Sequence, residues 1–334
     1  MKINCFELGS ISRYRGELMG AAIIFVMLFH VGLPRDDAFF GLRRMGNIGV
    51  DIFLFLSGIG LWFAWIKNPS IKDFLRRRFK RIYPTWLVIA SLYYIPDYFF
   101  PQIVDHSGAC TGIGNLIANI GLNINFWLRT ELTFWYVPAI MALYVAAPFY
   151  MRLLSRNPVY RWLPVAMMAW CIVVQYVVPL NHALGHLEIF WSRLPIFFIG
   201  INLGQAVKEN RQLAGSSVWL ILFLFAGTLA VGIYLEQARH GTFPLFLERM
   251  LYIPLTVTAA LLAGKILPRS PRWFNWALRF VGALSLEIYL LHYHFVMRYI
   301  ERLHAGYWPT FLITLAATLP VAWLLGKAIN KIFK

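Results

Sequence analysis

Residues 17–30 read ELMGAAIIFVMLFH, an almost wholly apolar run that ends on a histidine. A run of this kind predicts a helix that crosses a membrane. An imidazole inside such a helix is costly to bury, which makes His30 a candidate functional residue. His30 could accept and return a proton near neutral pH as a general base. The alternative is a structural histidine that hydrogen-bonds a neighbouring helix.

A second apolar run follows and carries a single carboxylate. Residues 46–60 read GNIGVDIFLFLSGIG, with Asp51 close to their start. In one interpretation Asp51 orients a protonatable ring, as the third member of a catalytic triad does. In the other it satisfies backbone N–H groups near the beginning of a helix.

The densest cluster of charge comes next, in residues 72–84, which read KDFLRRRFKRIYP. One interpretation is a topology anchor that also touches anionic lipid headgroups. The other is a binding site for a phosphorylated donor, because the planar fork of arginine matches phosphate oxygens. The abrupt entry into an apolar helix at Tyr83-Pro84 favours the second interpretation for the cluster of Arg76, Arg77, Arg78, Lys80 and Arg81.

The composition excludes a soluble protein. Of the 334 residues 59% are hydrophobic, and the mean hydropathy is +0.61. The formal net charge of +16 does not predict a nucleic-acid partner here, because the basic residues lie between apolar runs and are typical of topology signals. Cys5, Cys110 and Cys171 are isolated in the sequence, so neither a disulfide framework nor a metal site is expected.

The apolar runs predict an all-α, polytopic transmembrane helical bundle with about ten spans, forming a single domain over residues 1–334. If the N-terminus is cytoplasmic, 22 of the 31 basic residues fall on the inner side, as the positive-inside rule requires. We therefore predict a protein of the inner (plasma) membrane with both termini in the cytoplasm. The expected spans are 17–34, 46–66, 83–101, 135–151, 162–180, 190–207, 217–235, 245–264, 277–296 and 308–328.

One apolar segment, residues 113–128, is too short to fit this scheme as a crossing. We expect it to form an interfacial or re-entrant helix on the outer side. Asn115, Asn119 and Asn123 recur every four residues, which predicts a shared helical face. Because amides suit the recognition of hydroxyl groups, this face is a candidate lining for the entrance of an acceptor substrate.

More ionisable groups lie inside later spans. Residues 285–294 read SLEIYLLHYH and include Glu287 and His292, while Arg193 precedes a run of Phe and Ile. These three residues are candidate substrate ligands in a polar cavity. A structural pairing of Glu or Ser with His between helices is the alternative for residues 285–294.

Three of these segments resemble the integral-membrane acyltransferase family 3, which includes bacterial polysaccharide O-acetyltransferases. Residues 46–58 are similar to the family signature G-x-x-G-V-D-[IL]-F-F-x-L-S-G, and residues 78–84 to its R-x-x-R-I-x-P signature. Residues 20–30 are similar to its first helix, which ends on the family's essential histidine. Residues 135–148, 193–200 and 288–292 also fit later segments of the family.

The resemblance implies an O-acyltransferase with acetyl-CoA, or another acyl-CoA, as co-substrate and no metal. Arg78 and Arg81 would then hold the phosphates and the pantetheine arm of the donor. It implies a carbohydrate or glycolipid acceptor, with His30 as general base or transient acyl carrier and Asp51 supporting its ring or the local fold. The family commonly has a basic residue where this chain has Met19, a role that would fall to Arg15. Membrane lipid is an expected partner, and a homo-oligomer stays open. A proton-coupled transporter and a non-catalytic factor in envelope polymer export are the alternative functions.

Overall fold

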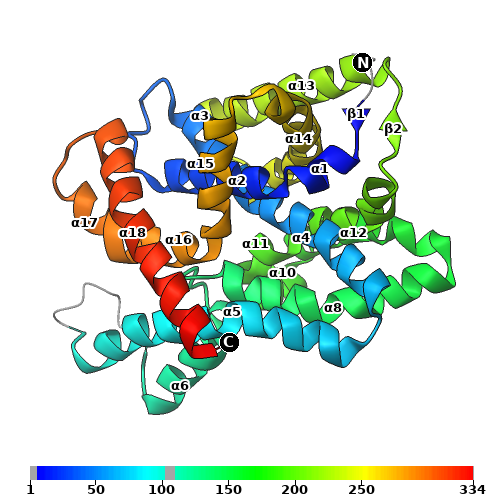
Figure 1. The fold of residues 1–334 in the computed structure, drawn as a ribbon. Helices are drawn as coiled ribbons and strands as arrows, with labels where there is room; N and C mark the ends of the chain where they lie inside the picture. The colour runs from blue at the N-terminus through cyan, green and yellow to red at the C-terminus, as the bar shows by residue number, and fades with distance from the viewer. Residues whose placement is uncertain (1–5, 102–109, 334) are drawn as a thin grey trace.

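The computed structural model describes residues 6–101 and 110–333, and this part of the chain is almost entirely helical (Figure 1). Cys5 lies outside the described residues, and Cys110 and Cys171 are free thiols. In the described part, the one sheet pairs β1 (Phe6–Glu7) with β2 (Gln212–Leu213) in antiparallel register.

The helices divide by type into α-helices and a few short 3-10 and π segments. The α-helices are α1 (Gly9–Arg13), α2 (Arg15–His30), α3 (Phe40–Arg44), α4 (Ile48–Lys67), α5 (Ile71–Phe99), α6 (Ile113–Leu122), α7 (Ile124–Leu128), α8 (Tyr136–Arg156), α9 (Leu163–Tyr176), α10 (Val178–Leu184), α11 (Glu188–Trp191), α12 (Leu194–Lys208), α13 (Ser217–Arg239), α14 (Leu245–Ile266), α15 (Arg272–Ala283), α16 (Ser285–Leu291), α17 (Arg298–Glu301) and α18 (Tyr307–Phe333). The 3-10 helices are η1 (Met45–Asn47), η2 (Pro158–Trp162), η3 (Gly185–Leu187) and η4 (Leu267–Arg269), and the π-helix is η5 (His292–Met297).

Ten membrane spans are not confirmed. Among the described residues, five helices are long and apolar enough to cross a membrane, and seven if each of two bent pairs is one span. The five are Phe40–Lys67, Tyr136–Arg156, Ser217–Arg239, Leu245–Arg269 and Tyr307–Phe333. The bent pairs are Pro158–Tyr176 with Val178–Trp191, which turn by 100°, and Arg272–Ala283 with Ser285–Glu301, which turn by 62°.

Three expected spans fall on helices that do not qualify. The run 17–34 corresponds to α2, whose 16 residues measure about 24 Å. The run 190–207 corresponds to α12, which has 15 residues. A helix needs roughly 20 apolar residues to cross the hydrocarbon core, so both are short. The run 83–101 is the second part of α5, a 29-residue helix whose first turns hold the basic cluster.

Glycines of the 46–58 segment let two neighbouring helices approach α4 closely. A Cβ atom on Gly49 would lie 2.2 Å from the carbonyl oxygen of Ala22 on α2. A Cβ atom on Gly58 would lie 2.2 Å from the carbonyl oxygen of Phe197 on α12. Any side chain at these positions would push the helices apart. Small residues at the interfaces of membrane helices allow the backbones to approach closely. The segment therefore holds α2 and α12 against α4.

A buried ion pair reinforces the contact between α4 and α12. Asp51 is 0% exposed and Arg193 is 1% exposed, and Arg193 Nε lies 3.5 Å from Asp51 Oδ2. Arg193 also donates a hydrogen bond to Asn47 Oδ1 at 2.8 Å, and its guanidinium lies 5.1 Å from the centre of the Trp135 ring. Both oxygens of Asp51 lack a hydrogen-bond partner in the described part of the chain, so the attraction rests on charge.

The expected single helix over 113–128 is wrong, because Asn123 breaks it. Asn123 adopts a left-handed conformation with φ 49°, which asparagine tolerates better than most residues, and it separates α6 from α7. Asn115 and Asn119 share a helical face as expected, and Asn119 Nδ2 donates to Asn115 Oδ1 at 3.1 Å. Asn123 instead accepts a hydrogen bond from the Tyr94 hydroxyl at 2.9 Å. These amides bind one another and the surrounding helices.

Candidate active site

Two histidines from distant segments meet at the centre of the candidate site. His30 is the last residue of α2 and His292 is the first residue of the π-helix η5. Nδ1 of His30 lies 3.3 Å from Nε2 of His292, and the two ring centres are 5.0 Å apart. His30 is half-buried, whereas His292 is 1% exposed. The pair was not expected, although each residue was a candidate alone.

The hydrogen bonds of this pair define which ring nitrogens carry protons. Nδ1 of His292 lies 2.9 Å from the carbonyl oxygen of Ile288, and a carbonyl oxygen only accepts, so this nitrogen donates and Nε2 of His292 accepts. Nδ1 of His30 donates in turn, to Val26 O at 2.8 Å and to His292. Nε2 of a neutral His30 is then unprotonated, and it has no hydrogen-bond partner among the described residues. A nitrogen in this state is the one that general-base catalysis needs.

The π-helix explains why neighbouring residues face the same partner. Single π-helical turns within α-helices occur frequently at functional sites. In η5 the rings of His292 and of the next residue, Tyr293, lie 5.0 and 5.2 Å from the His30 ring, centre to centre. In a regular α-helix successive side chains diverge by about 100°. Both rings thus lie against the ring of His30 at the start of the π-helix.

A narrow slot of about 60 Å³ lies beside residues whose backbone holds the histidine pair, and neither histidine ring is among its lining residues. Its lining includes two basic residues, Arg15 and Arg81, and the hydroxyl-bearing Ser57. Its lining also includes Val26 and Tyr289, whose carbonyl oxygens accept hydrogen bonds from His30 and His292. The slot therefore connects the basic ends of α2 and α5 to the backbone that holds both rings.

The two arginines that line the slot, Arg15 and Arg81, belong to a basic cluster with Arg78. Arg15, Arg78 and Arg81 are electrostatic neighbours, and none of them forms an ion pair within the described residues. The Nε atoms of Arg15 and Arg78 are also buried without a hydrogen-bond partner there. Other arginines of the chain are paired with acids, namely Arg44, Arg193, Arg211, Arg249 and Arg279. Three clustered guanidinium groups that form no ion pair favour the binding of an anion, although Glu287 is an acidic electrostatic neighbour of Arg81.

Comparison with known proteins decides the family. The family model described as an acyltransferase domain matches residues 20–327, nearly the whole chain. The chain belongs to acyltransferase family 3. This acyltransferase is also 28% identical over 169 residues to the "Regulator of hypoxia-inducible factor 1" of Caenorhabditis elegans, covering 41% of this chain and 33% of that protein. The chain thus spans about a third of the length of this curated relative, and no solved structure matches it significantly.

The acyltransferase places several sequence-predicted residues away from the histidine pair. Asp51 and Arg193 bind each other and neither is hydrogen-bonded to His30, whose ring is oriented by a carbonyl oxygen and by His292. Glu287 is half-buried and is an electrostatic neighbour of Arg81, at the other end of the slot. The asparagines of α6 are engaged in their own network.

A second ionisable cluster was missed by sequence reasoning. Glu236, which is 0% exposed, binds Arg44 through two hydrogen bonds of 3.1 and 3.2 Å and also binds His240. Arg44 in turn stacks on Phe29, with its guanidinium 4.7 Å from the ring centre, beside His30. The signal was present in the sequence, because a carboxylate at the end of the apolar run 217–235 is unusual.

Proposed function

We propose that this membrane acyltransferase moves an acetyl group from acetyl-CoA to a hydroxyl group of a cell-surface polysaccharide or glycolipid. The observation that supports the proposal is the arrangement of His30. Its Nε2 is an available base, and a slot connects the backbone beneath it to a group of arginines that have no ion-pair partner in the described chain.

The donor would enter with its phosphates at the basic end of the slot. Arg78 and Arg81 suit the phosphates of CoA, because guanidinium forks bind phosphate oxygens in pairs. Arg15 lies one helical turn before Met19, and both residues line the slot on the same face of α2. Arg15 is therefore well positioned to replace the basic residue that the family commonly has at position 19. The pantetheine arm would then follow the slot toward Val26.

The acyl transfer needs one base and one donor of a hydrogen bond. Nε2 of His30 takes the proton of the acceptor hydroxyl while its oxygen attacks the thioester carbonyl, so that a C–O bond forms and the C–S bond breaks. The proton then passes from His30 to the departing CoA thiolate. His292 Nε2 and the Val26 carbonyl accept the Nδ1 proton of His30, which stabilises the transient imidazolium.

Tyr289 is the residue best suited to stabilise the tetrahedral intermediate. Its hydroxyl oxygen accepts a hydrogen bond from the backbone N–H of Tyr136 at 3.3 Å, and its side chain lines the slot. Its own proton is then available to the thioester oxygen, where negative charge develops during the attack. Preorganised donors of this kind commonly contribute several kcal/mol to catalysis.

The reaction is tested with the purified protein and with cells. Incubation with acetyl-CoA should release free CoA thiol, and mass spectrometry of envelope glycans should show that the loss of this gene removes an acetyl mass. Thiol release without any change in glycans would refute the glycan acceptor. The absence of both effects would refute the function and favour a transporter or an assembly factor.

The proposal also states from which side of the membrane the acetyl-CoA donor binds. We propose an inner-membrane protein with cytoplasmic termini, so that the loop before α5 faces the cytoplasm where CoA is found. A cysteine at Ser70, the N-cap of α5, tests this assignment. An impermeant thiol reagent should fail to label it in intact cells and should label it in inverted vesicles. Labelling of intact cells would reverse the orientation and the donor side together.

A further inference from the structure

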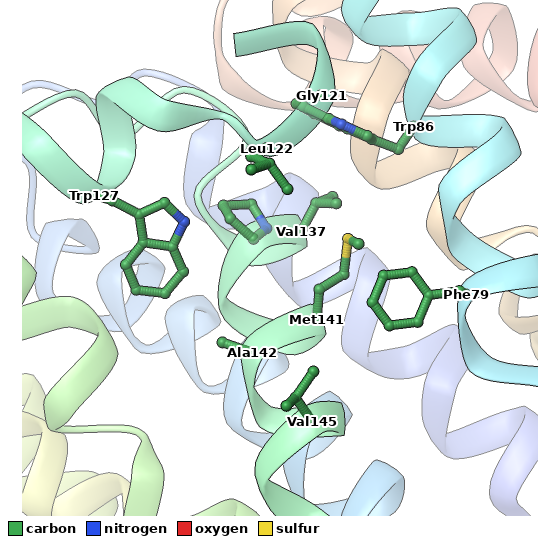
Figure 2. Close-up of a pocket in the computed structure, with 10 residues that line it drawn as sticks. Phe79, Trp86, Gly121, Leu122, Trp127, Val137, Met141, Ala142 and Val145 are labelled. Carbon is green, nitrogen blue, oxygen red and sulfur yellow. The ribbon is translucent and has the colours of Figure 1, made fainter. Parts of the chain in front are cut away.

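An apolar groove of about 220 Å³, with a lining distinct from that of the slot, lies between α5, α6, α7 and α8 (Figure 2). Val137, Met141 and Val145 line it from one face of α8, at spacings of four residues. Trp86 of α5 and Leu122 of α6 approach from the other side, as Figure 2 shows. None of its lining side chains is charged.

The groove has the place and length for a hydrocarbon chain. The α8 wall belongs to a helix that is long and apolar enough to span a membrane. From Val137 to Val145 this wall measures about 12 Å along the helix axis. Gly121 lies at the rim, and no atom lies within 4 Å of the position of a Cβ there, so the rim is open. Apolar surface of this kind at membrane depth accepts acyl chains from the bilayer.

The α5 wall changes from aromatic to basic within two helical turns. Lys72, Arg76, Phe79 and Trp86 recur at intervals of four, three and seven residues, which places them on one face of the helix. Phe79 and Trp86 line the groove, while Lys72 and Arg76 are exposed and form no ion pair with any described residue. A positive site therefore continues directly from the apolar groove.

We infer that this groove binds an anionic glycerophospholipid, with one acyl chain between α5 and α8 and its phosphate on Lys72 and Arg76. The chemistry of the two parts selects this ligand. An apolar groove alone would accept any lipid, and a basic site alone would accept any phosphate. Only an amphiphile with a phosphate head and a hydrocarbon tail can occupy the apolar groove and the adjoining basic site together. The CoA donor lacks the tail, and a zwitterionic lipid lacks the net charge.

Charge gives the expected selectivity. Each basic residue near an anionic headgroup contributes enough attraction for a severalfold preference, so two should favour phosphatidylglycerol over phosphatidylcholine by roughly thirtyfold. The site does not depend on the acyl-transfer reaction. The bound lipid would join α5 to α8 and so fix the helix that also carries Arg78 and Arg81.

Native mass spectrometry of the purified protein, titrated with dioleoyl phosphatidylglycerol or dioleoyl phosphatidylcholine, tests the inference. Lys72→Ala with Arg76→Ala should reduce the preference for phosphatidylglycerol by about tenfold or more. The matched control is Lys67→Ala with Arg77→Ala, which removes the same charge from exposed residues outside the face. The control should keep the preference. An equal loss in both variants would show a general charge effect and overturn the site.

The acyl-chain part is tested separately by filling the groove. Ala142→Trp places a large side chain in the groove, whereas Ala146→Trp places it one turn further along α8, at an exposed position outside the lining. The first should lower the amount of bound phosphatidylglycerol about tenfold and the second should leave it unchanged. Val145→Trp, at a lining position that is 43% exposed, repeats the test if the first variant does not fold. Full binding in a folded, groove-filled variant would overturn the inference.

Discussion

The ion pair of Asp51 and Arg193 offers a direct test of how the fold is held together. Asp51→Asn removes one charge and leaves the other, on a side chain that is 1% exposed. Breaking a buried pair in this way typically costs about 3–5 kcal/mol, because an uncompensated charge stays buried. The 3.5 Å separation and the absence of a hydrogen bond between the two groups indicate a pair of poor geometry. Removing both charges of the pair should therefore lower the free energy of unfolding only slightly.

The double variant Asp51→Asn, Arg193→Met removes both charges and nearly preserves side-chain volume. Its free energy of unfolding, measured in mixed detergent micelles, should exceed that of Asp51→Asn by about 2 kcal/mol or more. Acetyl transfer per folded molecule should return with it. A double variant that is stable and inactive would contradict the reasoning, because Asp51 would then act in the chemistry.

Three further experiments address the slot and the histidine pair. Arg78→Lys with Arg81→Lys keeps the charge but loses the planar fork, so KM for acetyl-CoA should rise about tenfold or more, while an unchanged KM would leave the cluster as an anchor. His292→Phe removes a hydrogen-bond acceptor from the His30 ring and should lower kcat about tenfold, and His292→Gln should partly restore it. Equal kcat values in the two variants would exclude His292 as this acceptor. Tyr289→Phe should lower kcat by one to two decades without changing the donor KM, and a kcat at the wild-type level would exclude it as a donor.

The local parts of the structure followed from the sequence, and the distant pairings did not. The apolar run 17–30 does form a helix that ends at His30. The ten predicted spans are not confirmed, because hydropathy does not detect short or bent helices such as α2 and the α15–α16 pair. It also treated 83–101 as a separate element, although the helix begins at Ile71.

In the candidate site, too, single residues could be predicted from the sequence, and their partners could not. His30 and His292 were identified singly, because an ionisable group in an apolar run is unusual wherever it lies, and Arg81 was identified as part of the basic cluster. Their partners could not be identified, since helix packing brings together residues that are far apart in the sequence. For Asp51 the sequence left the ring of His30 and the local fold as alternatives, and it could not identify Arg193 as the partner. The break at Asn123 depends on bonds to other segments, which helical periodicity does not include.

The central claim is that His30 is the base of an acyl transfer, and one measurement tests it most directly. Purified wild-type protein and His30→Ala are compared for acetyl transfer from labelled acetyl-CoA to envelope glycan, together with thermal melting and acetyl-CoA affinity. The account predicts normal folding and donor binding in the variant, with transfer reduced by at least two decades. A folded His30→Ala protein that transfers acetyl groups at the wild-type rate would contradict it.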